Sequence, residues 1–209
     1  MSAVGARVTG DIHTRVLDGT GVEETLLQRD MLSRPQDAVP GGGTLLFQSR
    51  PADIKAGRSL MLLSLDDHKV TPWSPSSGGS LGRISRDGRW IAFVSDETGQ
   101  DEVYVGRFPQ GGEKWRVSTA GGRGPLWRGD GRELYYFSSD HYVMRVAFHD
   151  QPVPDIGSPV PLFRTQLREF LSDPYYDVTA DGQRFLLTRP VHVDAGASLT
   201  LEQGWSPVR

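Results

Sequence analysis

The feature that most restricts the fold of this chain is a short turn sequence that recurs at a nearly constant spacing. Three copies combine Asp-Gly with an aromatic or aliphatic run: RDGRWIAFVS, GDGRELYYFS and ADGQRFLLTR. A fourth copy, PGGGTLLFQS, has Gly41 where the others have aspartate. The aligned glycines are 46, 43 and 51 residues apart, at Gly42, Gly88, Gly131 and Gly182. A period of this length indicates repeated supersecondary units, each of which buries its apolar face against its neighbours.

The Asp-Gly pairs predict tight hairpin turns. The aspartate side chain can accept hydrogen bonds from the backbone of its own turn, and glycine adopts the positive φ that such a turn requires. In each unit the turn joins a first strand to a second. We therefore expect structural turn residues at Gly42, Asp87, Gly88, Asp130, Gly131, Asp181 and Gly182.

Glycine and proline interrupt the chain at short intervals, and the segments between them indicate β-strands. The chain has 25 Gly and 14 Pro among 209 residues, which leaves little room for long helices. Runs such as TLLFQS, SLMLLSL, EVYVGRF, VMRVAF and RFLLT are rich in β-branched, aromatic and aliphatic residues. Residues 22–32 and 167–173 have some helical character. We assign Glu23–Gln28 to a strand because of its place in the repeat.

Each period holds enough strands for one four-stranded antiparallel unit. Between Gly88 and Gly131, the runs RWIAFVS, EVYVGRF, KWRVST and PLW are separated by glycine-containing turns. Four strands in roughly 40–45 residues are typical of a β-propeller blade. The sequence therefore predicts an all-β fold, a partial or small β-propeller with roughly four blades. We expect an N-terminal tail at 1–10 and one propeller domain at 11–209, with units at about 11–32 (partial), 33–80, 81–123, 124–172 and 173–209 (partial).

Four stretches resemble a known repeat: DGTGVEETLL, SRDGRWIAFVSDETGQDEVYVGRFP, KWRVSTAGGRGPLWRGDGRELYYFSSD and YYDVTADGQRFLLTRP. They are similar to the TolB-like, WD-repeat-like β-propeller repeats at the C-terminal end of many bacterial serine/threonine protein kinases. The resemblance spans residues 11 to 205 and implies a sensing or protein-binding module, usually with six blades. The chain departs from this pattern at Pro40–Gly42, where Pro-Gly-Gly replaces Pro-Asp-Gly, and it has too few repeats for six blades.

Composition excludes several classes of partner. The net charge is −3 and no cluster of Lys and Arg is visible, so we expect no nucleic-acid partner. The absence of cysteine excludes disulfides and zinc–thiolate sites. The longest aliphatic run, Leu60–Leu63, is far shorter than the roughly 20 residues of a membrane helix. We expect no cofactor and no membrane segment, and the sequence assigns no compartment; an extracytoplasmic location would fit a receptor kinase.

The segment GGSLG at Gly78–Gly82 matches the Gly-x-Ser-x-Gly pattern of hydrolase nucleophile elbows. An elbow needs a buried strand before the serine and a helix after it. Ser80 instead follows the segment SPSSGG and precedes residues that align with a first strand. We therefore place Ser80 in an inter-blade loop and expect no catalytic residue. The resemblance also implies an alternative function, because similar propellers cap prolyl-oligopeptidase-like peptidases: a propeller domain associated with such a hydrolase.

Kinase motifs are also missing from the chain. It has no glycine-rich loop with a following strand lysine, no His-Arg-Asp segment and no Asp-Phe-Gly triplet. Any kinase activity would lie elsewhere in a longer parent polypeptide. Asp66-Asp67-His68, Asp140-His141 and the acidic segment 96–102 could suggest metal sites, but we assign all three to hairpin turns and predict no metal site.

A ligand is expected beside the first strand of each blade, because these strands line the central channel of a propeller. Arginine and aromatic side chains there would suit a carboxylate or an extended peptide, although packing or solvation is the alternative role for each one. Together these features predict a non-catalytic binding or sensor module for a protein or small molecule. The candidate ligand-binding residues are Arg34, Arg83, Arg123, Trp127, Tyr175 and Tyr176.

Roughly four blades are too few for a six-bladed ring, so three arrangements are open. A small ring could close by pairing Ile12–Val16 or Glu23–Gln28 with C-terminal strands, two arcs could join as a homodimer through open blade edges, or the chain could be part of a larger protein. We favour an incomplete arc. Such an arc would expose a blade face and unpaired strand edges.

Overall fold

The computed structural model describes residues 10–15, 23–28, 31–51, 57–73, 78–165 and 176–187. These residues form strands and turns and contain no helix, which confirms the all-β prediction. Consequently, no helix of the described part could cross a membrane. Residues 167–173, where some helical character was noted, lie outside the described residues.

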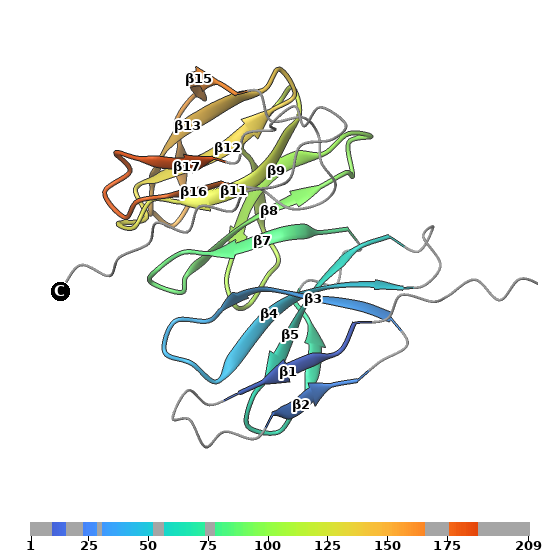
Figure 1. Cartoon of the computed structure of the whole chain (residues 1–209). Helices are drawn as coiled ribbons and strands as arrows, with labels where there is room; N and C mark the ends of the chain where they lie inside the picture. The colour runs from blue at the N-terminus through green and yellow to red at the C-terminus, as the bar shows by residue number, and fades with distance from the viewer. Residues whose placement is uncertain are drawn as a thin grey trace, which may run out of the picture.

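Three antiparallel sheets, two of four strands and one of five, make up most of the structure, and we call them blades 1, 2 and 3 (Figure 1). Blade 1 contains β3 (Met31–Ala38), β4 (Thr44–Pro51), β5 (Ser59–Ser64) and β6 (Val70–Pro72). Blade 2 contains β7 (Ser80–Ile84), β8 (Trp90–Ser95), β9 (Glu102–Arg107) and β10 (Lys114–Arg116). Blade 3 contains β11 (Gly122–Trp127), β12 (Glu133–Ser138), β13 (Tyr142–His149) and β15 (Val160–Arg164), and the short β14 (Asp155–Ile156) also pairs with β13.

A two-stranded hairpin lies at each end of the row of blades (Figure 1). The N-terminal hairpin is β1 (Ile12–Thr14) and β2 (Glu24–Leu27), and the C-terminal hairpin is β16 (Tyr176–Val178) and β17 (Phe185–Leu187). Among the strands that the structure describes, β1 and β2 pair with each other and with no C-terminal strand. The described part is therefore an open arc, not a ring closed through its N-terminal strands.

The first strands of the blades begin slightly earlier than the predicted units. They start at Met31, Ser80 and Gly122, whereas the units were placed from 33, 81 and 124. The extra residues include serine and glycine, which have low strand propensity, and their pairing with a neighbouring strand determines their conformation. The segment Glu24–Leu27 is a strand, despite its helical spacing.

All four copies of the repeated turn have the same backbone hydrogen bonds. The glycine N–H donates to the carbonyl three residues earlier at 2.7 to 3.0 Å, in the pairs Gly42–Val39, Gly88–Ser85, Gly131–Arg128 and Gly182–Thr179. The φ angles of these glycines are 81°, 70°, 71° and 70°. Asp87, Asp130 and Asp181 each accept a backbone N–H two residues ahead at 3.0 to 3.1 Å. Blade 1 makes the turn without an aspartate, because a third glycine, Gly43, also takes a positive φ.

Blades 2 and 3 share a second backbone feature, a bulge in the first strand. Ser80 pairs with Val94 and Arg83 with Ala92, so the first strand has one extra residue against the second. Arg123 and Leu126 show the same offset in β11. The bulge places Leu81 at φ 54° and its repeat equivalent, Gly124, at φ 61°. Burial of the Leu81 side chain between blades 2 and 3 offsets the strain of this backbone conformation.

The hydrophobic core lies between the blades rather than within one layer. Along β8, alternate residues face opposite neighbours: Trp90, Ala92 and Val94 pack toward blade 3, whereas Ile91 and Phe93 pack toward blade 1. Both faces of β8 are therefore buried, which explains why its sequence is continuously apolar.

The two hairpins cover the outer faces of the end blades. Ile12, Leu26 and Leu27 of the N-terminal hairpin pack against Phe47 and Leu63 of blade 1. At the other end, the Phe185 ring lies 5.0 Å from Tyr135 and 5.4 Å from Phe163 of blade 3. Among the described residues, these hairpins thus cover part of the outer faces of blades 1 and 3. The outward side of the N-terminal hairpin carries polar residues, including His13, Glu23 and Thr25.

Candidate functional site

The first strands of the three blades, β3, β7 and β11, lie next to one another, and the Tyr176 hydroxyl joins β16 to β11. We call these four the innermost strands, and the surface that they form the inner wall. Side-chain hydrogen bonds join them across the blade boundaries. The Asp37 carboxylate in β3 accepts the Ile84 N–H of β7 at 2.9 Å, and the Trp127 indole Nε1 of β11 donates to the Arg83 carbonyl of β7 at 3.0 Å. These contacts fix the spacing of the strands that carry the candidate binding residues.

Arg83 bridges two innermost strands. Its Nη1 donates to the Gln36 carbonyl of β3 at 2.6 Å and to the Gly82 carbonyl of β7 at 3.2 Å. The residue is half-buried, and the two carbonyls hold one end of its guanidinium in place.

The aromatic candidates make packing contacts between blades. The Tyr176 hydroxyl donates to the Gly124 carbonyl at 2.6 Å, and its ring lies 4.3 Å from that of Phe137. Burial raises the pKa of Tyr176 well above 10, and the positive charge of Arg83 only partly opposes this shift. Trp127 packs edge-on against Phe148 at 5.0 Å. Because these contacts are all between groups of the protein, a ligand role for Trp127 and Tyr176 stays a prediction. Tyr175 lies outside the described residues.

Two further arginine candidates occupy different positions on the inner strands. Arg34 is a half-buried residue of β3. Arg123 lies at the start of β11 with 53% of its side chain exposed. It forms an ion pair with Asp101, whose Oδ2 accepts the Arg123 Nε–H at 2.6 Å and also contacts Arg123 Nη2. Asp101 Oδ1 also accepts a hydrogen bond from Arg58 Nη2 at 3.2 Å. We call Arg58, Asp101 and Arg123 the rim cluster.

A buried carboxylate lies beside the rim cluster. Glu102 has no solvent exposure, and its oxygens accept hydrogen bonds from Gln100 Nε2 at 2.6 Å, from the Gly121 N–H at 3.1 Å and from the Ser118 hydroxyl. The Ser118 hydroxyl in turn accepts the Val103 N–H at 2.8 Å. Because its oxygens are occupied by protein donors, Glu102 holds the connection between blades 2 and 3 in place.

Ser80 is the first residue of β7 and is only 1% exposed, so its assignment to a loop was wrong. A strand follows Ser80, whereas a nucleophile elbow has a helix there. The Ser80 hydroxyl has no hydrogen-bond partner among the described residues. Its burial between blades keeps it away from solvent.

The Asp/His pairs lie in turns between strands. The carboxylate of Asp67, in the β5–β6 turn, accepts the Lys69 N–H at 3.2 Å, and His141, in the β12–β13 turn, has φ 66°. Within the described ranges, no group of three or more His, Asp or Glu side chains could hold a metal ion.

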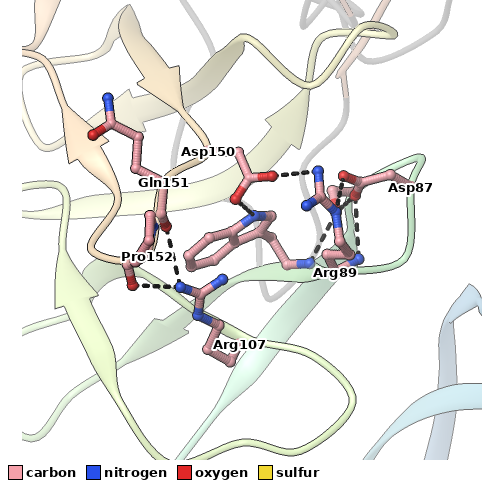
Figure 2. A network of polar contacts seen from close by, with 8 residues as sticks. Asp87, Arg89, Arg107, Asp150, Gln151 and Pro152 are labelled. Atoms are coloured by element: carbon pink, nitrogen blue, oxygen red, sulfur yellow. Dashed lines mark hydrogen bonds and ion pairs between the residues drawn. The ribbon is translucent and has the colours of Figure 1, made fainter.

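A polar network joins blades 2 and 3 on the side of the Asp-Gly turns (Figure 2). Asp150 accepts the Trp90 indole N–H at 3.1 Å and forms an ion pair with Arg89, which also pairs with Asp87 at 2.8 Å. The Arg107 guanidinium lies 4.0 Å above the Trp90 ring and donates to the carbonyls of Gln151 and Pro152. The network fastens β8 and β9 to the loop after β13.

Sequence reasoning missed Arg58, Asp101 and Asp150. It assigned Asp101 to a solvated hairpin, yet the Asp101 side chain is only 12% exposed. The position of Asp101 in the repeat could have indicated its role. Asp101 is the last residue of the β8–β9 loop, and this loop lies beside the start of β11, the innermost strand of the next blade. No local pattern indicates that Arg58, 43 residues earlier, approaches the same carboxylate.

Comparisons with known proteins identify the fold. No family model matches the chain, and no curated protein matches it. The structure is similar to that of TolB from Acinetobacter baumannii, with a TM-score of 0.63 and 17% identity over 90% of this chain and 44% of that one. A TolB structure from Agrobacterium tumefaciens gives a TM-score of 0.53 and 18% identity over 73% of this chain and 60% of that one.

The chain thus spans between two fifths and three fifths of the length of these TolB structures. Identities of this size support a statement about fold alone. The described strands form three complete blades with a half-blade at each end. The chain therefore has a β-propeller fold of the TolB type, and the strands that the structure describes form an open arc.

Proposed function

We propose that this protein is a non-catalytic propeller module that binds a protein or small-molecule ligand at its inner wall. The observation that carries this proposal is the placement of Arg34, Arg83 and Arg123 on three consecutive innermost strands. Three cations on adjacent strands, in a chain with a net charge of −3, favour a ligand that carries negative charge or carbonyl acceptors.

We also propose that this protein has no hydrolase activity of its own. It is supported by the burial of Ser80 and by the strand that follows it. A fluorophosphonate probe should leave the purified protein unlabelled. Stoichiometric labelling at Ser80 would instead favour the hydrolase alternative.

The parent polypeptide is proposed to be a bacterial receptor-type serine/threonine kinase, with this module as its C-terminal sensor. The support is the similarity of the four repeated stretches to kinase-associated propeller repeats. Immunoblotting of the native protein, followed by mass spectrometry of the detected band, tests this directly. Kinase peptides in a band much larger than 23.0 kDa are expected, and peptides of a hydrolase domain would contradict the proposal.

Ligand binding is tested by affinity capture from a lysate of the source cells. Wild-type protein is compared with the double variant Arg34→Ala/Arg123→Ala, and Arg132→Ala serves as the control because it removes an exposed arginine from a β11–β12 turn. All three proteins must first show the same melting temperature. We expect a ligand that wild type and the control retain and the double variant loses. Identical capture by all three would contradict a binding role for the inner wall.

A further inference from the structure

Three consecutive blades each contribute one side chain to the rim cluster. Arg58 precedes β5 of blade 1, Asp101 precedes β9 of blade 2, and Arg123 belongs to β11 of blade 3. Asp101 receives both guanidinium groups on its two oxygens, at 3.2 Å from Arg58 Nη2 and 2.6 Å from Arg123 Nε. One carboxylate therefore holds two arginines from different blades in a fixed orientation.

The backbone around this cluster is also fixed. The Asp101 carbonyl accepts the Gly122 N–H at 2.9 Å, next to Arg123. The neighbouring Glu102 holds Ser118 and Gly121 of the same connection. A Cβ on Gly122 would lie 2.5 Å from the Ser118 hydroxyl, so this connection has no room for a larger residue. Arg123 is therefore preorganised, which reduces the entropy lost when a ligand binds.

The guanidinium groups of the rim cluster have hydrogen-bond donors beyond those that contact Asp101. Within the cluster, two guanidinium groups face the one carboxylate of Asp101, while the neighbouring Glu102 carboxylate is fully buried and bonded to Gln100, Ser118 and Gly121. Each guanidinium has five N–H donors in a planar fork, and only two nitrogens of Arg123 contact Asp101. Asp101 is 12% exposed and Arg58 29%, whereas Arg123 is 53% exposed, so the donors accessible to a ligand come mainly from Arg123.

We infer that the rim cluster binds a single carboxylate group of the ligand. This inference rests on the proposed function, since it names the chemical class of the ligand at one end of the inner wall. A planar carboxylate matches the guanidinium fork of Arg123, which is the most exposed member of the cluster. A phosphate dianion fits less well, because its second charge would be placed close to the Asp101 carboxylate.

The probes are N-acetyl-Ala-Ala with a free C-terminus, its C-terminal amide, sodium acetate and inorganic phosphate, each titrated by isothermal calorimetry into the full chain. We expect a free carboxylate to bind and the amide and phosphate to bind at least about tenfold more weakly, as the loss of a charged hydrogen-bonding partner implies. Binding of the peptide acid but not acetate would assign a peptide C-terminus as the source. Binding of acetate as tightly as the peptide would assign a small free carboxylate.

Variants locate the site. Arg123→Gln should weaken carboxylate binding by about tenfold or more, and Arg123→Lys should retain part of it because the charge remains without the planar fork. Arg116→Gln, at an exposed position in β10, should bind as wild type does.

Three results would overturn the inference: equal binding of acid and amide, unchanged binding by Arg123→Gln, or no carboxylate binding. If wild-type protein still captures a ligand from the lysate, such a result removes the carboxylate assignment and leaves the proposed function standing. If neither the titration nor the lysate capture detects a ligand, both the carboxylate inference and the proposed function are rejected.

Discussion

The indole N–H of Trp90 donates a hydrogen bond to the Asp150 carboxylate at 3.1 Å, across the boundary between blades 2 and 3. Trp90 is 1% exposed, so its N–H has little access to water in the folded chain. The same carboxylate pairs with Arg89, and Arg107 lies on the face of the Trp90 ring (Figure 2). The largest side chain of this core is thus oriented by a residue 60 positions away.

Replacing Asp150 with alanine should destabilise the protein by about 1–3 kcal/mol, because the Trp90 N–H would be left buried without an acceptor. Urea denaturation monitored by tryptophan fluorescence measures the change. Asp155→Ala removes an exposed carboxylate near His149 and serves as the control. In the Trp90→Phe background, Asp150→Ala should lower the free energy of unfolding by a smaller amount, because phenylalanine has no N–H that needs an acceptor. Equal costs in the two backgrounds would contradict a coupling between these residues.

Gly131→Val should destabilise the β11–β12 turn by about 1–2 kcal/mol or more, whereas Gly131→Asn should cost less. Gly131 has φ 71°, and a Cβ there would meet nothing within 4 Å, so the cost is conformational rather than steric. Asparagine tolerates the left-handed region better than a β-branched residue does. Thermal melting of both variants tests the order. A valine variant as stable as the asparagine variant would argue against the assigned turn.

Gly129→Ala should weaken the contact between blade 3 and the C-terminal hairpin. The Gly129 N–H donates to the Ala180 carbonyl at 3.0 Å, and a Cβ on Gly129 would lie 2.7 Å from that oxygen. Limited proteolysis should then cut faster within residues 176–187. Arg132→Ala is the control, because it removes an exposed side chain from the same turn and leaves the Gly129–Ala180 contact intact. Unchanged cleavage in the Gly129 variant would show that the two backbones can separate without releasing the hairpin.

Asp87 should contribute to stability above about pH 4 and lose that contribution in acid. Burial alone would raise the pKa of Asp87, but hydrogen bonds from Ser85, the Arg89 N–H and the Arg89 guanidinium outweigh it and lower the pKa below 3.8. Because the folded pKa is depressed, stability is present above the unfolded pKa and is lost as pH falls through the folded value.

Chemical denaturation between pH 7 and pH 2 measures this dependence. The free energy of unfolding of Asp87→Asn should fall less steeply in acid than that of wild type. The slope for Ser85→Ala, which removes one hydrogen-bond donor to the Asp87 carboxylate, should lie between the two. Parallel curves for all three proteins would exclude a role for the Asp87 carboxylate in acid sensitivity.

The repeated turn could be predicted from the sequence because its determinants are local. An aspartate that bonds its own backbone and a glycine with positive φ lie next to each other in the chain, and the spacing of the copies indicated blades. Strand content followed from short β-rich runs. The starts of β7 and β11 were placed too late because Ser80 and Gly122 adopt extended backbone through pairing with strands that follow them.

The tertiary structure decided what the sequence could not. The Ser80 motif resembled a nucleophile elbow, but blade packing buries its hydroxyl. Arg123 was predicted from its place in an innermost strand, whereas Arg58 and Asp101 reach it only because three blades stack side by side. Local sequence determines turns and strand faces through short-range hydrogen bonding and side-chain alternation. The partners of each charged side chain depend on how blades tens of residues apart pack together, and that packing is a property of the whole chain.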